Sequence, residues 1–101
     1  MENTTSFDQA KIDHIKRLLE QAIPNGTVCD VLRYRDWMKY EVVYRANKSF
    51  LCVSDEFLGL DEAEISKRFE RECVARAIQK NPKGRFILIR DGLQQRSCED
   101  I

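Results

Sequence analysis

The side chains best suited to binding chemistry gather in one short stretch of this 101-residue chain. Between residues 33 and 40 cationic and aromatic residues are interleaved, and a further arginine follows at position 45. Arginine and aromatic residues are enriched in the cores of protein interfaces, where large rigid surfaces are buried at small entropic cost. The same mixture can stack bases and neutralise phosphates. The candidate partner-binding residues are therefore Arg33, Arg35, Trp37, Lys39 and Arg45.

Trp37 decides between the interpretations of this stretch. In the plainest one, the aromatic residues enter the core of a hairpin and the cations are merely solvated. Strand alternation, however, places Trp37 on the same face as Lys39 and Arg45. The opposite face carries Met38 and Tyr40, so Trp37 is expected to be exposed. An exposed tryptophan among cations calls for a partner, either a protein or a nucleic acid.

Catalytic and metal-binding patterns are absent from the sequence. It contains no nucleophile elbow, phosphate-binding glycine loop, HExxH or EF-hand pattern. The single histidine, His14, lies off the apolar stripe of its predicted helix and is interpreted as a solvated residue. The acid pairs Asp55-Glu56 and Asp61-Glu62 are typical of helix starts. We therefore expect no catalytic residue, no metal site and no cofactor.

The four cysteines are too far apart in the sequence to form a CxxC pair. Cys29 and Cys52 lie in apolar runs, and Cys73 falls on the apolar stripe of a predicted helix. These three are expected to be small buried hydrophobic residues rather than disulfide partners or metal ligands. Cys98 lies in a polar segment and is expected to be exposed.

The bulk composition narrows the classes of partner. Seventeen basic residues balance seventeen acidic ones, which argues against a purely electrostatic partner such as bulk nucleic acid or an anionic membrane. A net charge of zero also makes self-association easier. The amino terminus is polar, and no stretch reaches the roughly 18 apolar residues of a membrane span. A cytoplasmic location without membrane contact is expected.

Apolar periodicity predicts a helix, three strands, a second helix and a fourth strand. The first helix is capped by Ser6 and ended by Pro24. The second begins at Asp61 and stops at Asn81, and residues 54–59 form a connector of about one helical turn. The predicted strands are 27–34, 38–46, 49–54 and 85–90, with a hairpin turn at Asn47-Lys48.

These elements predict an α+β fold of two layers, in the order α-β-β-β-α-β. Two amphipathic helices pack on one face of a mostly antiparallel sheet. A right-handed crossover returns the last strand parallel to the third, inside the sheet and, as a guess, beside the first. Residues 1–92 form a single α+β domain, and residues 93–101 form a polar, frayed tail.

The expected function is that of a non-catalytic interaction or regulatory module. It would bind a protein partner or a second copy of itself through the sheet face or an open strand edge. The alternative is a nucleic-acid-binding domain that uses the basic and aromatic hairpin from Arg33 to Arg45, and a small enzyme or enzyme subunit ranks third. A second basic cluster would reinforce the first only if the fold brought the two together; it comprises Lys80, Lys83 and Arg85.

Overall fold

A computed structural model describes the backbone of residues 2–100 and the side chains of residues 9–99. The elements follow in the order α1 (Glu2–Ala22), β1 (Thr27–Tyr34), β2 (Trp37–Tyr44), β3 (Asn47–Ser54), α2 (Asp55–Leu58), α3 (Glu62–Arg71), α4 (Val74–Lys80), β4 (Arg85–Ile89), β5 (Gly92–Gln94) and the 3₁₀ helix η1 (Cys98–Asp100). The strands form one mixed, mostly antiparallel sheet in the order β1-β2-β3-β4-β5. The predicted α+β class and element order are confirmed.

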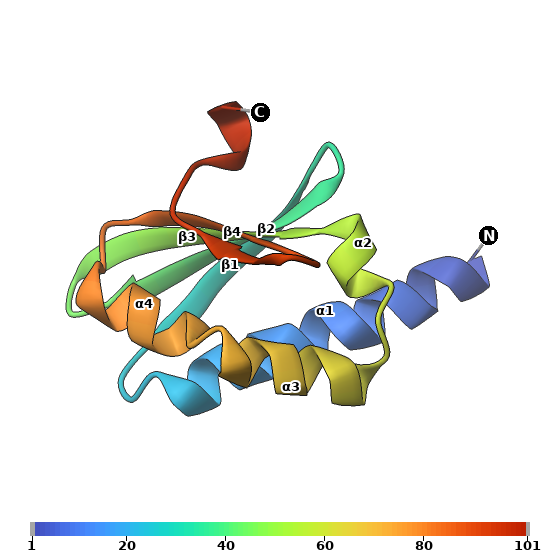
Figure 1. The fold of residues 1–101 in the computed structure, drawn as a ribbon, viewed down its shortest axis with the longest axis horizontal. Helices are drawn as coiled ribbons and strands as arrows, with labels where there is room; N and C mark the ends of the chain where they lie inside the picture. Colours follow the sequence, from blue (N-terminus) through green and yellow to red (C-terminus); the bar gives the residue numbers. More distant parts are fainter. Residues whose placement is uncertain (1, 101) are drawn as a thin grey trace.

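The molecule has two main layers, because the amphipathic helices need the sheet to bury their apolar stripes. Helices α1, α3 and α4 lie along one face of the sheet, whereas η1 lies on the opposite side (Figure 1). The helices contribute Ile15, Leu19, Ile65, Phe69, Val74 and Ile78 to the core, and Ile23 joins them from the turn after α1. The sheet contributes Val28, Met38, Tyr40, Val42, Leu51, Val53, Phe86 and Leu88.

Tyr40 ties the two layers together with a polar contact inside this core. Its ring is fully buried, and its hydroxyl donates a hydrogen bond to the Ile12 carbonyl of α1 at 2.9 Å. Burial, with a smaller contribution from the carboxylate of Asp13, raises the pKa of Tyr40 well above its ordinary value. The hydroxyl therefore stays protonated and keeps its donor role.

The hairpin between β2 and β3 turns two residues earlier than predicted. The turn consists of Arg45 and Ala46, which both have positive φ, of 54° and 62°. Asn47, expected in the turn, is instead the first residue of β3, and its side chain donates to the Arg45 carbonyl. This register pairs the two strands along their whole length. It also leaves Ser54 at the end of β3, where its hydroxyl accepts from the Phe57 amide and caps α2.

The second predicted helix is broken into α3 and α4. Asp61 caps α3 as expected, because its carboxylate accepts from the Glu64 amide at 2.8 Å. Cys73 then adopts a left-handed conformation with a φ of 55°. The break advances the buried stripe by one residue, from Phe69 to Val74 instead of Cys73. Cys73 is consequently exposed, which corrects its predicted burial.

β4 runs parallel to β3, as the crossover rule predicts. It lies between β3 and β5, not beside β1. Its two apolar faces are explained by this interior position, which the short strand β5 creates by closing the edge. The segment after residue 92 was expected to be a frayed tail. It contributes β5 to the sheet, and Cys98 beyond it is buried.

Candidate functional site

The sheet face turned away from the helices, called the outer face below, carries two of the five predicted binding residues, Trp37 and Lys39. Strand pairing places Lys39 of β2, Cys52 of β3 and Ile87 of β4 side by side in one row. The next row contains Glu41, Phe50 and Arg85. Tyr34 and Trp37 pair with each other beside the β1–β2 turn. The outer face is therefore apolar and aromatic in part, with charged residues among the rings.

The five predicted binding residues do not form a single patch. Arg35 lies in the turn between β1 and β2, and Arg45 lies in the turn at the far end of β2. That eight-residue strand spans about 27 Å. Each arginine stacks on a neighbouring ring 5.3 Å from its centroid, Arg35 on Tyr34 and Arg45 on Tyr44. Arg33 is paired with Asp55 at 2.6 Å.

Trp37 was expected to be exposed, and it is half-buried. With Tyr34 and Ile89 it packs against a small apolar cluster on the outer face, separate from the main core. The buried members of this cluster are Cys52, Ile87 and Cys98. Cys98 belongs to the C-terminal tail, defined here as residues 95–100, so the tail covers part of the outer face and of the surroundings of Trp37.

A disulfide fixes the tail to the sheet. Cys52 of β3 and Cys98 of the tail are bonded; they are 46 positions apart in the sequence, and their Cα atoms are 6.3 Å apart. The expectation that Cys98 is exposed is wrong, because only 2% of it is accessible. Cys52 is buried as predicted, but it is not a free thiol. Cys29 and Cys73 are free and exposed, so their predicted burial is wrong.

Glu99 of the tail occupies a site that is built to hold a carboxylate. One oxygen accepts from Lys39 at 2.9 Å, and the other is 3.3 Å from the Arg85 guanidinium. The hydrogen bond and charge of Lys39, followed by the charge of Arg85, lower the pKa of Glu99. Both cations also lie over the Phe50 ring, 4.8 and 4.9 Å from its centroid. Lys39, Phe50 and Arg85 are called the carboxylate site below.

Sequence reasoning found only Lys39 of this site. Arg85 was grouped with Lys80 and Lys83 around the loop into β4. Because β4 is parallel to β3, both strands begin at the same end of the sheet. Arg85, the first residue of β4, therefore lies at the end that carries Arg45, not at the end that carries Arg33. Phe50 lies within the predicted strand 49–54, and no binding role was predicted for it. Strand alternation could have indicated that Phe50 and Arg85 each point to the outer face. Only the pairing of β3 with β4 shows that they are neighbours.

Both edges of the sheet are protected against strand pairing. At β1 the Val28 amide donates to Glu20 at 3.2 Å, and the Val31 amide donates to the side chain of Asp30 at 3.0 Å. A register shift between Val28 and Asp30 also interrupts this strand. At β5 the Leu93 amide donates to Glu72 at 3.1 Å. Occupied amides and irregular pairing oppose the addition of another strand.

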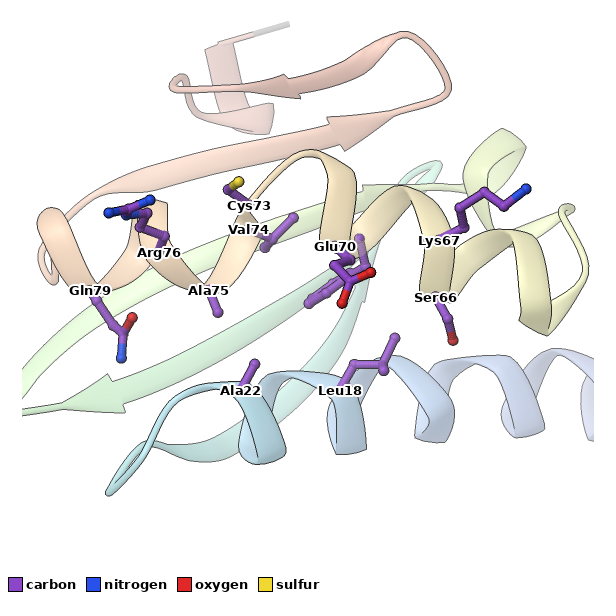
Figure 2. A pocket seen from close by; sticks show the side chains of 11 residues that line it. Leu18, Ala22, Ser66, Lys67, Glu70, Cys73, Val74, Ala75, Arg76 and Gln79 are labelled. Atoms are coloured by element: carbon purple, nitrogen blue, oxygen red, sulfur yellow. The ribbon is translucent and has the colours of Figure 1, made fainter.

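A groove of about 660 Å³ lies between α1 and the α3–α4 pair. Leu18 and Ala22 of α1 point towards α3 and α4 across it, whereas the Cys73 sulfur points away from α1 (Figure 2). Its walls mix apolar side chains such as Val74 with polar ones such as Gln79. Among the described side chains that line the groove, no group indicates which class of ligand would bind there.

His14 contacts Ser66 at one end of this groove, an arrangement that the sequence did not reveal. The His14 Nε2 and Ser66 Oγ atoms are 2.8 Å apart, and His14 Nδ1 is 3.9 Å from a Glu62 oxygen. A nucleophilic serine needs donors for the developing oxyanion. Ser66 lies within α3, where backbone amides are used by the helix itself. Glu62 is also half-exposed, so this contact is best described as a polar link between α1 and α3.

Within residues 9–99, no cluster of three or more histidine, cysteine or acidic side chains is placed to hold a metal ion. In the part of the chain that the structure describes, none of the helices is long and apolar enough to cross a membrane. Comparisons with protein-family models, curated proteins and solved structures find no match to this chain. Its function therefore has to be inferred from its own geometry.

Proposed function

We propose that the chain is a non-catalytic protein-interaction module whose outer face binds an acidic, extended segment of a protein partner. The observation that carries this proposal is the position of Glu99. A carboxylate is held between Lys39 and Arg85 above the Phe50 ring. The tail of the chain therefore binds in the way that we propose for an acidic segment of a partner.

The charges of the site favour an acidic segment over an apolar one. Lys39 is only 19% exposed, so its ammonium group is partly withdrawn from water and gains from a carboxylate neighbour. An arginine can bind a carboxylate through two parallel hydrogen bonds, which adds directional specificity. Glu99 is the carboxylate that lies within ion-pair distance of both Lys39 and Arg85, and an acidic residue of a partner would take its place.

An apolar anchor beside the carboxylate site completes the proposed surface. Trp37, Tyr34 and Ile89 are only partly buried against the cluster below them. Large aromatic side chains of this kind supply most of the binding energy at protein interfaces. The partner segment would place an acidic residue on Lys39 and Arg85, and an apolar residue near Trp37.

The sheet face is favoured over the sheet edge as the route of binding. Carboxylates occupy outward amides on both edge strands. A peptide that extended the sheet would have to displace them and follow the irregular register of β1. The face needs no such rearrangement of the backbone.

The nucleic-acid alternative is less well supported. Its five residues are divided between the two ends of β2, and two of its cations are already paired with carboxylates, Arg33 with Asp55 and Lys39 with Glu99. A phosphate backbone gains affinity mainly from cations that release counterions when they bind. Binding of a single-stranded oligonucleotide that weakens steeply with salt, without binding of an acidic peptide, would favour this alternative.

The test uses a synthetic peptide that copies residues 93–101 with serine in place of Cys98, called the tail peptide below. Its control carries glutamine and asparagine in place of Glu99 and Asp100. The tail peptide should bind reduced protein, and Lys39→Gln should weaken it by about threefold to fivefold, equivalent to no more than about 1 kcal/mol for a surface ion pair. Lys67→Gln on α3 is the matched control and should have no effect. Equal binding of both peptides would contradict the proposal.

Light scattering on a size-exclusion column identifies the source of the acidic segment. A dimer that dissociates in the Lys39→Gln variant would show that the tail of a second copy occupies the carboxylate site. A monomer at all concentrations would leave a different protein as the partner.

A further inference from the structure

We infer that the Cys52–Cys98 disulfide is a redox switch that controls access to the carboxylate site. The inference rests on the proposed function, because it concerns the regulation of that same surface. In the oxidised protein the bond keeps the acidic tail on the outer face. In the reduced protein the tail can leave, and the face becomes available to an acidic segment of a partner.

The position of the bond makes it the principal attachment of the tail. Cys52 lies in the row between Lys39 and Ile87, at the centre of the surface that a partner would use. Besides this bond, the tail is held by the packing of Cys98 in the small apolar cluster and by the two ion pairs of Glu99, whose side chain is 45% exposed. Exposed ion pairs contribute little to stability. Once the disulfide is broken, the remaining contacts are weak enough for a competitor to displace the tail.

The switch requires a dithiol reductant. A thiolate of the reductant attacks one sulfur of the bond and releases the other cysteine as a thiolate. The second thiol of the reductant then attacks the mixed disulfide. Two electrons and two protons pass to Cys52 and Cys98, and the reductant leaves as a disulfide. The sulfurs are buried, so attack follows local opening of the short tail, whose residues 95 and 96 are exposed.

The direction of the switch depends on the compartment. In a reducing compartment such as the cytoplasm, thiols are kept reduced. The open form would then be the resting state, and oxidation would close the face. Cys29 and Cys73 do not take part, because they are free and exposed on other parts of the surface.

The only tryptophan of the chain reports the position of the tail. Trp37 packs against the cluster that contains Cys98, so release of the tail should move its fluorescence emission to longer wavelength. Oxidised protein, protein reduced with dithiothreitol and the Cys98→Ser variant are compared. Native thiol titration should give two thiols for oxidised protein and four for reduced protein. Cys73→Ser is the matched control and should behave as wild type.

Binding of the tail peptide completes the experiment. A tethered tail competes at an effective concentration in the millimolar range, and a bonded one competes more strongly. Reduction or Cys98→Ser should therefore raise the affinity for the tail peptide by at least about tenfold, since apparent affinity follows the accessible fraction. Far-UV circular dichroism confirms that each form is folded.

The outcomes separate the switch from the proposed function. If reduction leaves Trp37 emission and peptide affinity unchanged while the peptide still binds, the switch is refuted and the binding function stands. If the emission shifts but the peptide binds neither form, the function fails and the tail release stands. Four reactive thiols in oxidant-treated protein would refute the switch, and so would loss of the folded state on reduction.

Discussion

Breaking the Cys52–Cys98 bond should destabilise the domain by a large and calculable amount. The bond joins residues 46 apart, and cross-linking a loop of that length removes conformational entropy from the unfolded chain. The loop-entropy relation gives about 4 kcal/mol at 25 °C. Small domains have stabilities of about 5–15 kcal/mol, so the reduced protein should remain folded with a much smaller margin. The corresponding fall in Tm is about 15–30 °C.

Urea denaturation followed by far-UV circular dichroism measures this loss directly. Oxidised wild type is compared with reduced wild type, Cys98→Ser and the control Cys73→Ser. Reduced wild type and Cys98→Ser should have the same lowered urea midpoint, and Cys73→Ser should have the midpoint of oxidised wild type. The dependence on urea should steepen in both, because an unfolded chain without the cross-link exposes more surface. Identical midpoints for all four forms would refute the assignment of the bond.

Three further predictions test the core, the β2–β3 turn and the tail. Phe69→Ala should cost about 3–5 kcal/mol in urea denaturation, and Trp37→Ala should cost less because its ring is only half-buried; equal losses would place Trp37 in the main core. Ala46→Gly should stabilise the protein by about 0.5–1 kcal/mol in thermal unfolding, because Ala46 has a φ of 62°; a loss of stability would contradict the turn. The pKa of Glu99 is lowered below its usual value of 4.5, so its contribution is present above that pH and lost as the pH falls through the lowered pKa. The stability difference between wild type and Glu99→Gln should therefore disappear in acid, and a difference that persists there would contradict the ion pairs.

The sequence predicted the layers and the order of elements because those depend on local periodicity. The stripe of α1 and the alternation of β2 both follow directly from residue spacing. The parallel return of β4 followed from the handedness of crossovers. The break at Cys73 could not be read in this way, because one left-handed residue advances the stripe without changing the composition of the helix.

The candidate site depends on long-range pairing, which periodicity does not encode. Arg33 and Arg45 are near each other in the sequence, yet a full strand separates them in the fold. Phe50 and Arg85 are distant in the sequence, and the parallel pairing of β3 and β4 makes them neighbours. The tail appeared polar and without period, and only its position over the sheet gives a role to Glu99.

Titration of reduced, ¹⁵N-labelled protein with the tail peptide tests the central claim most directly. The account predicts that amide signals move around Lys39, Phe50 and Arg85, and that the changes are lost in Lys39→Gln but retained in Lys67→Gln. Signals that move only along the α1–α3 groove or the β1 edge, or that do not move at all, would contradict binding of an acidic segment to the outer face.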